Sequence, residues 1–229
     1  MSMSWTGLIR KVVKEREAIP TPDAILYNAT VARVLRKPEA KIADDVAAKM
    51  RSGTVLDLGS GPGYLLIDIA RKTTSLTLYG IDLSRQMVKM ARRHAKGAGN
   101  VQFVLANAAR LPFKDDSIDL IISTGTLHHW KAPAEVFHEC HRVLKTGSEA
   151  WIYDGCPDVF RDRAHRERLK REYGFLIPRM GHGVAQLNGF SRQEYETRIR
   201  SMLEQTGFKD NCRMELTDIW MKVTFKKHG

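Results

Sequence analysis

Five short apolar segments, each separated from the next by a stretch long enough to hold a helix, most constrain what this chain can fold into. They occupy residues 54–58, 76–81, 101–105, 118–123 and 149–154. Strands that alternate with helices predict a parallel sheet covered on both faces, because each crossover returns the chain to the same end of the sheet. This pattern favours an open α/β architecture over a sandwich or a helical bundle.

The segments between these strands carry apolar residues at the spacing of a helix. They span residues 64–72, 84–96 and 133–144. Ser84 is an expected N-cap of the second helix and Gly97 its expected end, because a serine side chain accepts from helix N–H groups and glycine tolerates the left-handed conformation that ends many helices.

The end of the chain has the two-residue period of a strand. Within 219–226 the apolar positions are Ile219, Met221, Val223 and Phe225, and they alternate with Trp220, Lys222, Thr224 and Lys226. This alternation predicts a strand with one wetter face. Together with 212–217 it predicts an antiparallel hairpin at the edge of the sheet.

With 229 residues, of which 43% are hydrophobic and 28% charged, the chain predicts one globular domain, 1–229. We divide this domain into an N-terminal helical cap (1–50), a core (51–156), an insertion (157–190) and a closing helix with the edge hairpin (191–229). The cap and the insertion are expected above the carboxyl ends of the strands, where open α/β sheets bind ligands.

Targeting and redox signals favour a cytoplasmic protein. No apolar stretch approaches the roughly 18 to 20 uncharged residues that a membrane-spanning helix needs, and the first residues lack the apolar region of a secretion signal. The cysteines Cys140, Cys156 and Cys212 are odd in number and far apart, which predicts reduced thiols and no metal site.

A glycine-rich loop follows the first predicted strand. Its sequence, V-L-D-L-G-S-G-P-G over 55–63, places glycines where the backbone must turn sharply and a ligand must approach closely. Tyr64 stands where nicotinamide and flavin binders have their third glycine, so the spacing disfavours those cofactors.

Polar residues follow the next strands. Asp82 ends the second strand, where a carboxylate accepts hydrogen bonds from two ribose hydroxyls and disfavours a 2′-phosphate. Asn107 follows the third strand, and Ser123 ends the fourth. Because the carboxyl ends of parallel strands meet at one edge, these residues are expected to share a site with the glycine loop.

This ordered series, over roughly residues 40–155, resembles the class I S-adenosylmethionine-dependent methyltransferases, in particular the methyltransferase type 11 branch that includes the menaquinone and ubiquinone C-methyltransferases. The resemblance implies a Rossmann-like seven-stranded sheet, S-adenosylmethionine as cofactor and S-adenosylhomocysteine as product. It assigns cofactor contacts to Asp57, Gly59, Ser60, Gly61, Gly63, Asp82, Leu83, Met87, Asn107, Ala108, Ser123 and Thr124. Related families usually have aspartate in place of Asn107, although an amide oxygen also accepts from the adenine amino group.

Methyl transfer from a sulfonium is an in-line displacement, so positioning and exclusion of water supply much of the catalysis and a base is added when the acceptor carries a proton. The candidate bases are His128, His129, Asp154, Tyr27 and His182. Each also has a structural interpretation, such as capping a turn, packing or orienting substrate.

The predicted acceptor is a small organic molecule. The net charge of +11 and the basic segment 161–171 leave RNA open as a second type of acceptor, but the segment alternates basic with acidic residues and lacks interleaved aromatic residues for stacking. The sequence also leaves open a protein acceptor, or a non-catalytic protein that only binds the cofactor. Apolar residues near the N-terminus suit either a monomer with a lid or a homodimer.

Overall fold

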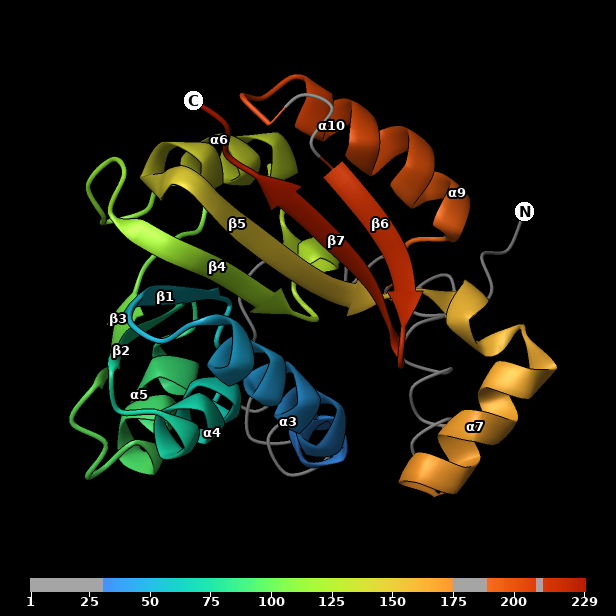
Figure 1. The fold of residues 1–229 in the computed structure, drawn as a ribbon, viewed down its shortest axis with the longest axis horizontal. Helices are drawn as coiled ribbons and strands as arrows, with labels where there is room; N and C mark the ends of the chain where they lie inside the picture. Colours follow the sequence, from blue (N-terminus) through green and yellow to red (C-terminus); the bar gives the residue numbers. More distant parts are fainter. Residues whose placement is uncertain (1–30, 175–188, 209–211) are drawn as a thin grey trace, which may run out of the picture.

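The computed structural model describes residues 31–174, 189–208 and 212–229. Seven strands form one sheet in the order β3-β2-β1-β4-β5-β7-β6 (Figure 1). The strands are β1 (Gly53–Leu58), β2 (Leu76–Asp82), β3 (Val101–Leu105), β4 (Ile118–Thr124), β5 (Leu144–Gly155), β6 (Cys212–Thr217) and β7 (Trp220–Lys226). Strands β1 to β5 pair in parallel, and β7 pairs antiparallel with both β5 and β6. The predicted sheet and its antiparallel C-terminal hairpin are confirmed.

Helices cover both faces of this sheet. On one side lie α3 (Val31–Lys49), α4 (Tyr64–Lys72) and α5 (Arg85–His94), with α3 packed along α4 (Figure 1). On the other side lie α6 (Pro133–Val143), α9 (Arg192–Glu194), the single π-helical turn η3 (Tyr195–Ile199) and α10 (Arg200–Glu204). The helix α7 (Arg163–Tyr173) lies beyond the end of β5, and two short 3₁₀ turns, η1 (Leu127–His129) and η2 (Pro157–Phe160), follow β4 and β5.

The centre of the sheet is mostly apolar because both of its faces are covered. Val55, Leu56 and Leu58 of β1 and Ile121 of β4 have no exposed surface. Strand β1 lies between β2 and β4. The chain first builds the sheet from β1 through β2 to β3, and then returns to β4 on the other side of β1, so the direction of sheet growth reverses there. The crevice at this reversal is where open α/β sheets bind ligands.

Local signals set most element boundaries. Ser84 is the N-cap of α5, and its hydroxyl accepts from the N–H of Met87 at 3.4 Å, as predicted. Pro133 opens α6, where its missing N–H costs no helical hydrogen bond. Gly97 follows α5 with a φ of +95°, the conformation that favours glycine.

Three expectations need correction. The segment 106–117 crosses from β3 to β4 without a helix, although its length allows one. Strand β5 begins at Leu144, before the predicted 149–154, because Leu144 pairs with Ile118 ahead of a register shift. Trp220 is 5% exposed and does not face water, because its side of β7 is covered at this end of the strand.

The hairpin is anchored by aromatic packing on α6 and on the end of the closing helix. The ring centroid of Phe225 lies 5.6 Å from that of Phe137 and 4.4 Å from that of Phe208. All three side chains are fully buried. These contacts hold β7 against β5 where Phe225 pairs with Ala150.

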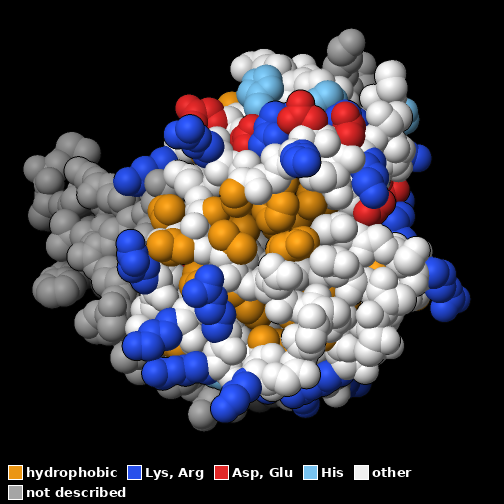
Figure 2. All heavy atoms as spheres, turned by 90° about the vertical axis from the view of Figure 1, so that its left-hand side faces the viewer, with side chains coloured by type: hydrophobic (Ala, Val, Ile, Leu, Met, Phe, Trp, Pro, Cys, Tyr) orange, Lys and Arg blue, Asp and Glu red, His pale blue; other side chains and the backbone are white. Residues whose placement is uncertain are grey.

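The side of the molecule that carries β2 and β3 is seen face-on in Figure 2. Lys and Arg side chains are spread there around a patch of apolar side chains. The cations of α5 and of the turn after it line a shallow surface that includes Leu105, which is 40% exposed. The basic charge on this face is scattered and does not form a continuous stripe.

Candidate functional site

The loop between β1 and α4 has its glycine backbone in the left-handed region, with φ of +51° at Gly61 and +82° at Gly63. A Cβ at Gly63, the N-cap of α4, would lie 2.5 Å from Cζ of Phe103, so no larger residue fits without movement. A Cβ at Gly61 would meet no atom within 4 Å. The space beside Gly61 is therefore open, and a ligand can approach the backbone there.

Asp82 ends β2 and holds the glycine loop in place. Its Oδ2 accepts a hydrogen bond from the backbone N–H of Gly61 at 2.9 Å, and its Oδ1 accepts one from Ser84 at 2.8 Å. Burial raises the pKa of this carboxyl, and the two backbone N–H donors oppose the rise. Each oxygen keeps a second lone pair, so Asp82 can also accept from two ribose hydroxyls.

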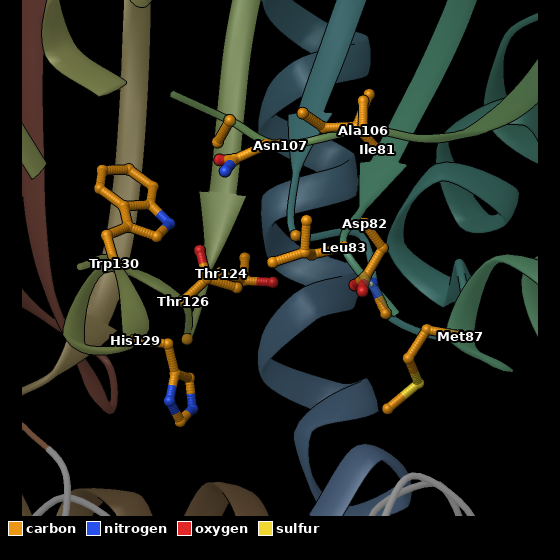
Figure 3. Close-up of a pocket in the computed structure, with 14 residues that line it drawn as sticks. Ile81, Asp82, Leu83, Met87, Ala106, Asn107, Thr124, Thr126, His129 and Trp130 are labelled. Atoms are coloured by element: carbon orange, nitrogen blue, oxygen red, sulfur yellow. Dashed lines mark hydrogen bonds between the residues drawn. The ribbon is translucent and has the colours of Figure 1, made fainter. Parts of the chain in front are cut away.

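A cavity of about 740 Å³, counted with its open mouth, lies at the carboxyl ends of the central strands. The predicted cofactor residues that line it are Gly59, Gly61, Asp82, Leu83, Met87, Asn107, Ala108 and Thr124. Sequence reasoning did not single out Ile81, Ala106, Gly125, Thr126 and Trp130, which also line it. Figure 3 shows Asp82 and Met87 on one side of the cavity and His129 and Trp130 on the other.

Two of the predicted residues make local contacts that fix the walls of this cavity. Ser123 is buried, donates to the carbonyl of Leu58 at 2.8 Å and shares a 2.6 Å hydrogen bond with the hydroxyl of Thr126. Its side chain joins β4 to β1 and does not line the cavity. Asn107 accepts from the N–H of Ala109 at 2.9 Å through Oδ1, which leaves its amide N–H groups for a ligand.

The turn after β4 places its two histidines in different surroundings. Asp154, at the end of β5, is 2.7 Å from Nδ1 of His128 through one carboxylate oxygen and accepts from the His128 backbone N–H at 2.9 Å through the other. The side chains of His128 and Asp154 are 7% and 1% exposed. The structure thus brings together two of the candidate bases as a buried pair that orients the turn.

His129 faces the cavity from the same turn (Figure 3). Burial and the neighbouring His128 lower its pKa to about 4, against a smaller opposing effect of Asp154. His129 is therefore uncharged near pH 7. Its Nδ1 is buried without a hydrogen-bond partner among the described residues. A neutral imidazole beside a cavity can accept a proton or a hydrogen bond.

A second hollow adjoins the first where the glycine loop meets α3. Its lining includes Glu39, Asp57, Ser60, Tyr64 and Thr124. Glu39 was not singled out from the sequence, since a lone glutamate in a helical segment is normally a surface residue. Two other candidate bases, Tyr27 and His182, lie outside the described residues.

The described residues fit an adenosine-bearing sulfonium cofactor. The loop offers open space at Gly61, Asp82 keeps free lone pairs, and Oδ1 of the buried Asp57 has no hydrogen-bond partner within the described part of the chain. Among the described residues, no Lys or Arg lines either hollow, which suits a ligand that brings positive charge. The sheet order, the glycine loop and the acidic end of β2 together define a methyltransferase fold of the nucleoside-binding α/β type.

Comparison with known proteins finds similarity to methyltransferases. A family model described as a methyltransferase domain matches residues 56–152. The ubiquinone/menaquinone biosynthesis C-methyltransferase of Geobacter sp. (strain M21) is 28% identical over 180 residues, which cover 72% of this chain and 74% of that protein. The malonyl-[acyl-carrier protein] O-methyltransferase of Marinomonas sp. (strain MWYL1) is 34% identical over 97 residues, which cover 42% of this chain and 36% of that protein.

A solved structure shares the fold across nearly the whole chain. The crystal structure of a putative S-adenosyl-L-methionine-dependent methyltransferase from Methanococcus maripaludis superposes with a TM-score of 0.72 at 22% identity, covering 93% of this chain and 95% of that one. These findings support a class I S-adenosylmethionine-dependent methyltransferase, an enzyme with S-adenosylmethionine as its cofactor.

Membrane-spanning and metal-binding features are absent from the described residues. None of their helices is both long and apolar enough to cross a membrane. Within the same ranges, no group of three or more His, Cys, Asp or Glu side chains is placed to hold a metal ion. Cys140, Cys156 and Cys212 are unpaired, and burial raises the pKa of the Cys156 and Cys212 thiols to about 11.

Proposed function

We propose that this enzyme transfers a methyl group from S-adenosylmethionine to a small organic acceptor that binds beside His129. The observation that carries the proposal is the uncharged, half-buried His129 on the wall of the cofactor cavity, opposite Asp82 and Met87 (Figure 3). The relatives named above as a quinone C-methyltransferase and an acyl-carrier O-methyltransferase support an organic acceptor, although their reacting atoms differ.

We assign the cofactor to the larger cavity. The cofactor supplies an electrophilic methyl group on a sulfonium sulfur. Asp82 would hold the ribose hydroxyls, and Leu83 and Met87 would flank the adenine, whose edge would meet Asn107 and Ala108. Gly59 and Gly61 would line the methionine part, with Asp57 and Ser60 of the adjoining hollow.

The reacting end of the cavity would then lie near Thr124 and His129. In this proposal the acceptor gains the methyl group and gives up a proton, which His129 accepts. His128 and Asp154 do not touch the acceptor. Their buried pair fixes the turn that carries His129, so they are positioning residues.

The helix α7 is proposed to cover the acceptor, as part of the predicted 157–190 insertion, whose residues 175–188 lie outside the described residues. Leu169 and Tyr173 of α7 are buried, and Nε2 of His165 lies 2.6 Å from the carbonyl of Asp218 in the β6–β7 turn. Cations of this region are partly paired on the surface, as in the 2.7 Å contact between Lys170 and Glu167. This pairing favours a solvated helix that covers the acceptor, and it disfavours an RNA-binding surface.

The test is to incubate the purified chain with methyl-labelled S-adenosylmethionine and a cell extract, and then to separate small molecules, RNA and protein. We expect label in the small-molecule fraction. Label in RNA or in protein would instead identify a macromolecular acceptor and contradict the proposal.

The role of His129 is tested with the same assay once the product is known. We expect His129→Gln to lower kcat by about 10²- to 10⁴-fold, the usual contribution of a general base, with little change in cofactor affinity. The matched control is His138→Gln, because His138 is an exposed histidine on α6 outside the cavity. An unchanged kcat in His129→Gln would exclude a proton-transfer role.

A further inference from the structure

The smaller hollow is built around two carboxyl groups that come from different parts of the chain. Asp57 is in β1 and is 1% exposed. Glu39 enters from α3, where its Oε1 lies 3.5 Å from the hydroxyl of Thr124. Oδ1 of Asp57 and the hydroxyl of Ser60 are buried and have no hydrogen-bond partner among the described residues. A buried carboxylate oxygen without a donor is costly unless a ligand supplies one.

The hollow is lined by acidic side chains, whereas the whole protein carries a net charge of +11. Burial, together with the nearby Asp57 and Asp68, raises the pKa of Glu39 to about 8, against smaller opposing effects of the Thr124 hydroxyl and Arg36. Burial and Asp82 raise the pKa of Asp57 to about 8. Two neighbouring carboxyl groups of this kind retain a proton near neutral pH because both cannot ionise cheaply.

Cations close to the hollow are already engaged. Arg36, on the same helix as Glu39, lies 4.8 Å from the ring centroid of Tyr64 and 3.5 Å from Asp68 of α4. Among the described residues that line the hollow there is no Lys or Arg. The hollow therefore offers carboxyl groups to a positively charged ligand.

The hollow is continuous with the proposed cofactor cavity. Gly59, Gly61 and Thr124 line both of them. A molecule that places its adenosine beside Asp82 would extend past the glycine loop toward Glu39 and Asp57. The methionine part of S-adenosylmethionine carries a primary ammonium group, which has three N–H donors and no acceptor. This is the group that two carboxylates and a hydroxyl can satisfy.

We propose that Glu39 of α3 joins Asp57 in recognising the α-ammonium group of the cofactor. The inference rests on the proposed placement of the cofactor and adds a residue from outside the glycine loop. It makes α3 part of the cofactor site, so the N-terminal segment selects for the amino-acid end of the ligand.

The test compares two ligands by titration calorimetry with the full chain. S-adenosylhomocysteine carries the α-ammonium group, and 5′-methylthioadenosine lacks the whole amino-acid part but keeps the adenosine. We expect Glu39→Gln to weaken S-adenosylhomocysteine about 10- to 100-fold, the effect of losing one charged hydrogen bond. Affinity for 5′-methylthioadenosine should stay within about twofold, since that ligand does not reach Glu39.

The matched control is Asp44→Asn. Asp44 lies on the same helix and is exposed, with its carboxylate 2.6 Å from Lys72. Its substitution also replaces a carboxyl group of α3 with an amide, but Asp44 does not line the hollow, so both affinities should stay unchanged. Thermal unfolding of Glu39→Gln checks that the variant is folded, and Gln is expected to be tolerated because it mimics the protonated glutamate.

Proton release on ligand binding distinguishes recognition of the ligand by Glu39 from a merely structural role, because a structural role would not change the number of protons released. At pH 7, titrations with S-adenosylhomocysteine in phosphate and in Tris buffer should show up to about one proton released by the unaltered chain and markedly less by Glu39→Gln. Unchanged S-adenosylhomocysteine affinity in Glu39→Gln, or an equal loss for both ligands, would overturn the role of Glu39. Failure of both ligands to bind the unaltered chain would instead overturn the placement of the cofactor.

Discussion

Asp154 holds His128 by two hydrogen bonds at once, one to the imidazole Nδ1 at 2.7 Å and one to the backbone N–H at 2.9 Å. The pair joins the turn after β4 to the end of β5, two neighbouring strands of the sheet. Because both the ring and the main chain of His128 are fixed, the following residue, His129, has a defined position on the cavity wall. The arrangement couples the stability of the turn to the geometry of the proposed transfer site.

Substitution Asp154→Ala should therefore destabilise the protein. It leaves the backbone N–H and the ring of His128 without partners in a buried place, which costs about 3 kcal/mol of the free energy of unfolding. Urea unfolding measures this. Asp44→Ala, which removes an exposed ion pair to Lys72, should change stability by less than about 0.5 kcal/mol. Equal effects of the two substitutions would contradict a special role for the buried pair.

The low pKa of His129 predicts how stability depends on pH. Its pKa in the folded protein is about 4, below the ordinary value of 6.5, so the unfolded chain binds the proton more tightly. The stability contribution is complete above about pH 6.5 and is lost as the pH falls toward 4. Between pH 6.5 and 4 the unaltered chain should lose stability relative to His129→Gln, by at most about 1.4 kcal/mol per pH unit. A difference that does not change with pH would show that His129 titrates normally.

The raised pKa of Glu39 predicts the opposite dependence of stability on pH. Its pKa in the folded protein is about 8, above the ordinary 4.5, so the folded state binds the proton more tightly. The unaltered chain without cofactor should lose stability as the pH rises from 4.5 to 8, whereas Glu39→Gln has no such proton to lose. The stability advantage of Glu39→Gln should thus grow across this range and level off above pH 8. Chemical unfolding at pH 5, 6.5 and 8 provides the comparison, and a constant difference would place Glu39 in contact with water.

Asp82→Ala should reduce the affinity for S-adenosylhomocysteine at least about 100-fold. It removes the proposed acceptor of the ribose hydroxyls and also the carboxylate that accepts from the backbone of Gly61 and Ser84. Calorimetric titration measures the loss. Asp115→Ala, at an exposed carboxylate paired with Arg142, is the control and should bind normally. Undiminished binding by Asp82→Ala would refute the ribose contact.

Comparing Gly63 of the glycine loop with Gly97 after α5 tests whether lack of space or backbone conformation excludes a larger residue from the loop. Both have positive φ, +82° and +95°, but a Cβ at Gly63 would meet Phe103 at 2.5 Å while one at Gly97 would meet nothing within 4 Å. Gly97→Ala should cost only about 1 kcal/mol of stability, from backbone strain. Gly63→Ala should cost about 2 kcal/mol more, because Phe103 must move. Thermal unfolding of the two variants measures both costs, and equal costs would show that the contact with Phe103 does not restrict Gly63.

Much of the fold followed from local patterns. The positions of the strands, the N-cap at Ser84 and the C-terminal hairpin are visible in short windows of sequence, because periodicity and capping act over a few residues. The cavity residues on the glycine loop and at Asp82 followed as well, since parallel strands bring their carboxyl ends to one edge. The missing helix in 106–117 did not follow, because length permits a helix without requiring one.

The sequence by itself determined the order of the elements, the class of cofactor site and most of the residues around the larger cavity. Only the tertiary structure decided that Ser123 turns inward to Leu58, that Asp154 pairs with His128, and that Glu39 reaches the hollow of Asp57. The physical reason is that these relationships join residues far apart in the chain. Which side chains meet there depends on how helices and strands pack across layers, and no local periodicity encodes that packing.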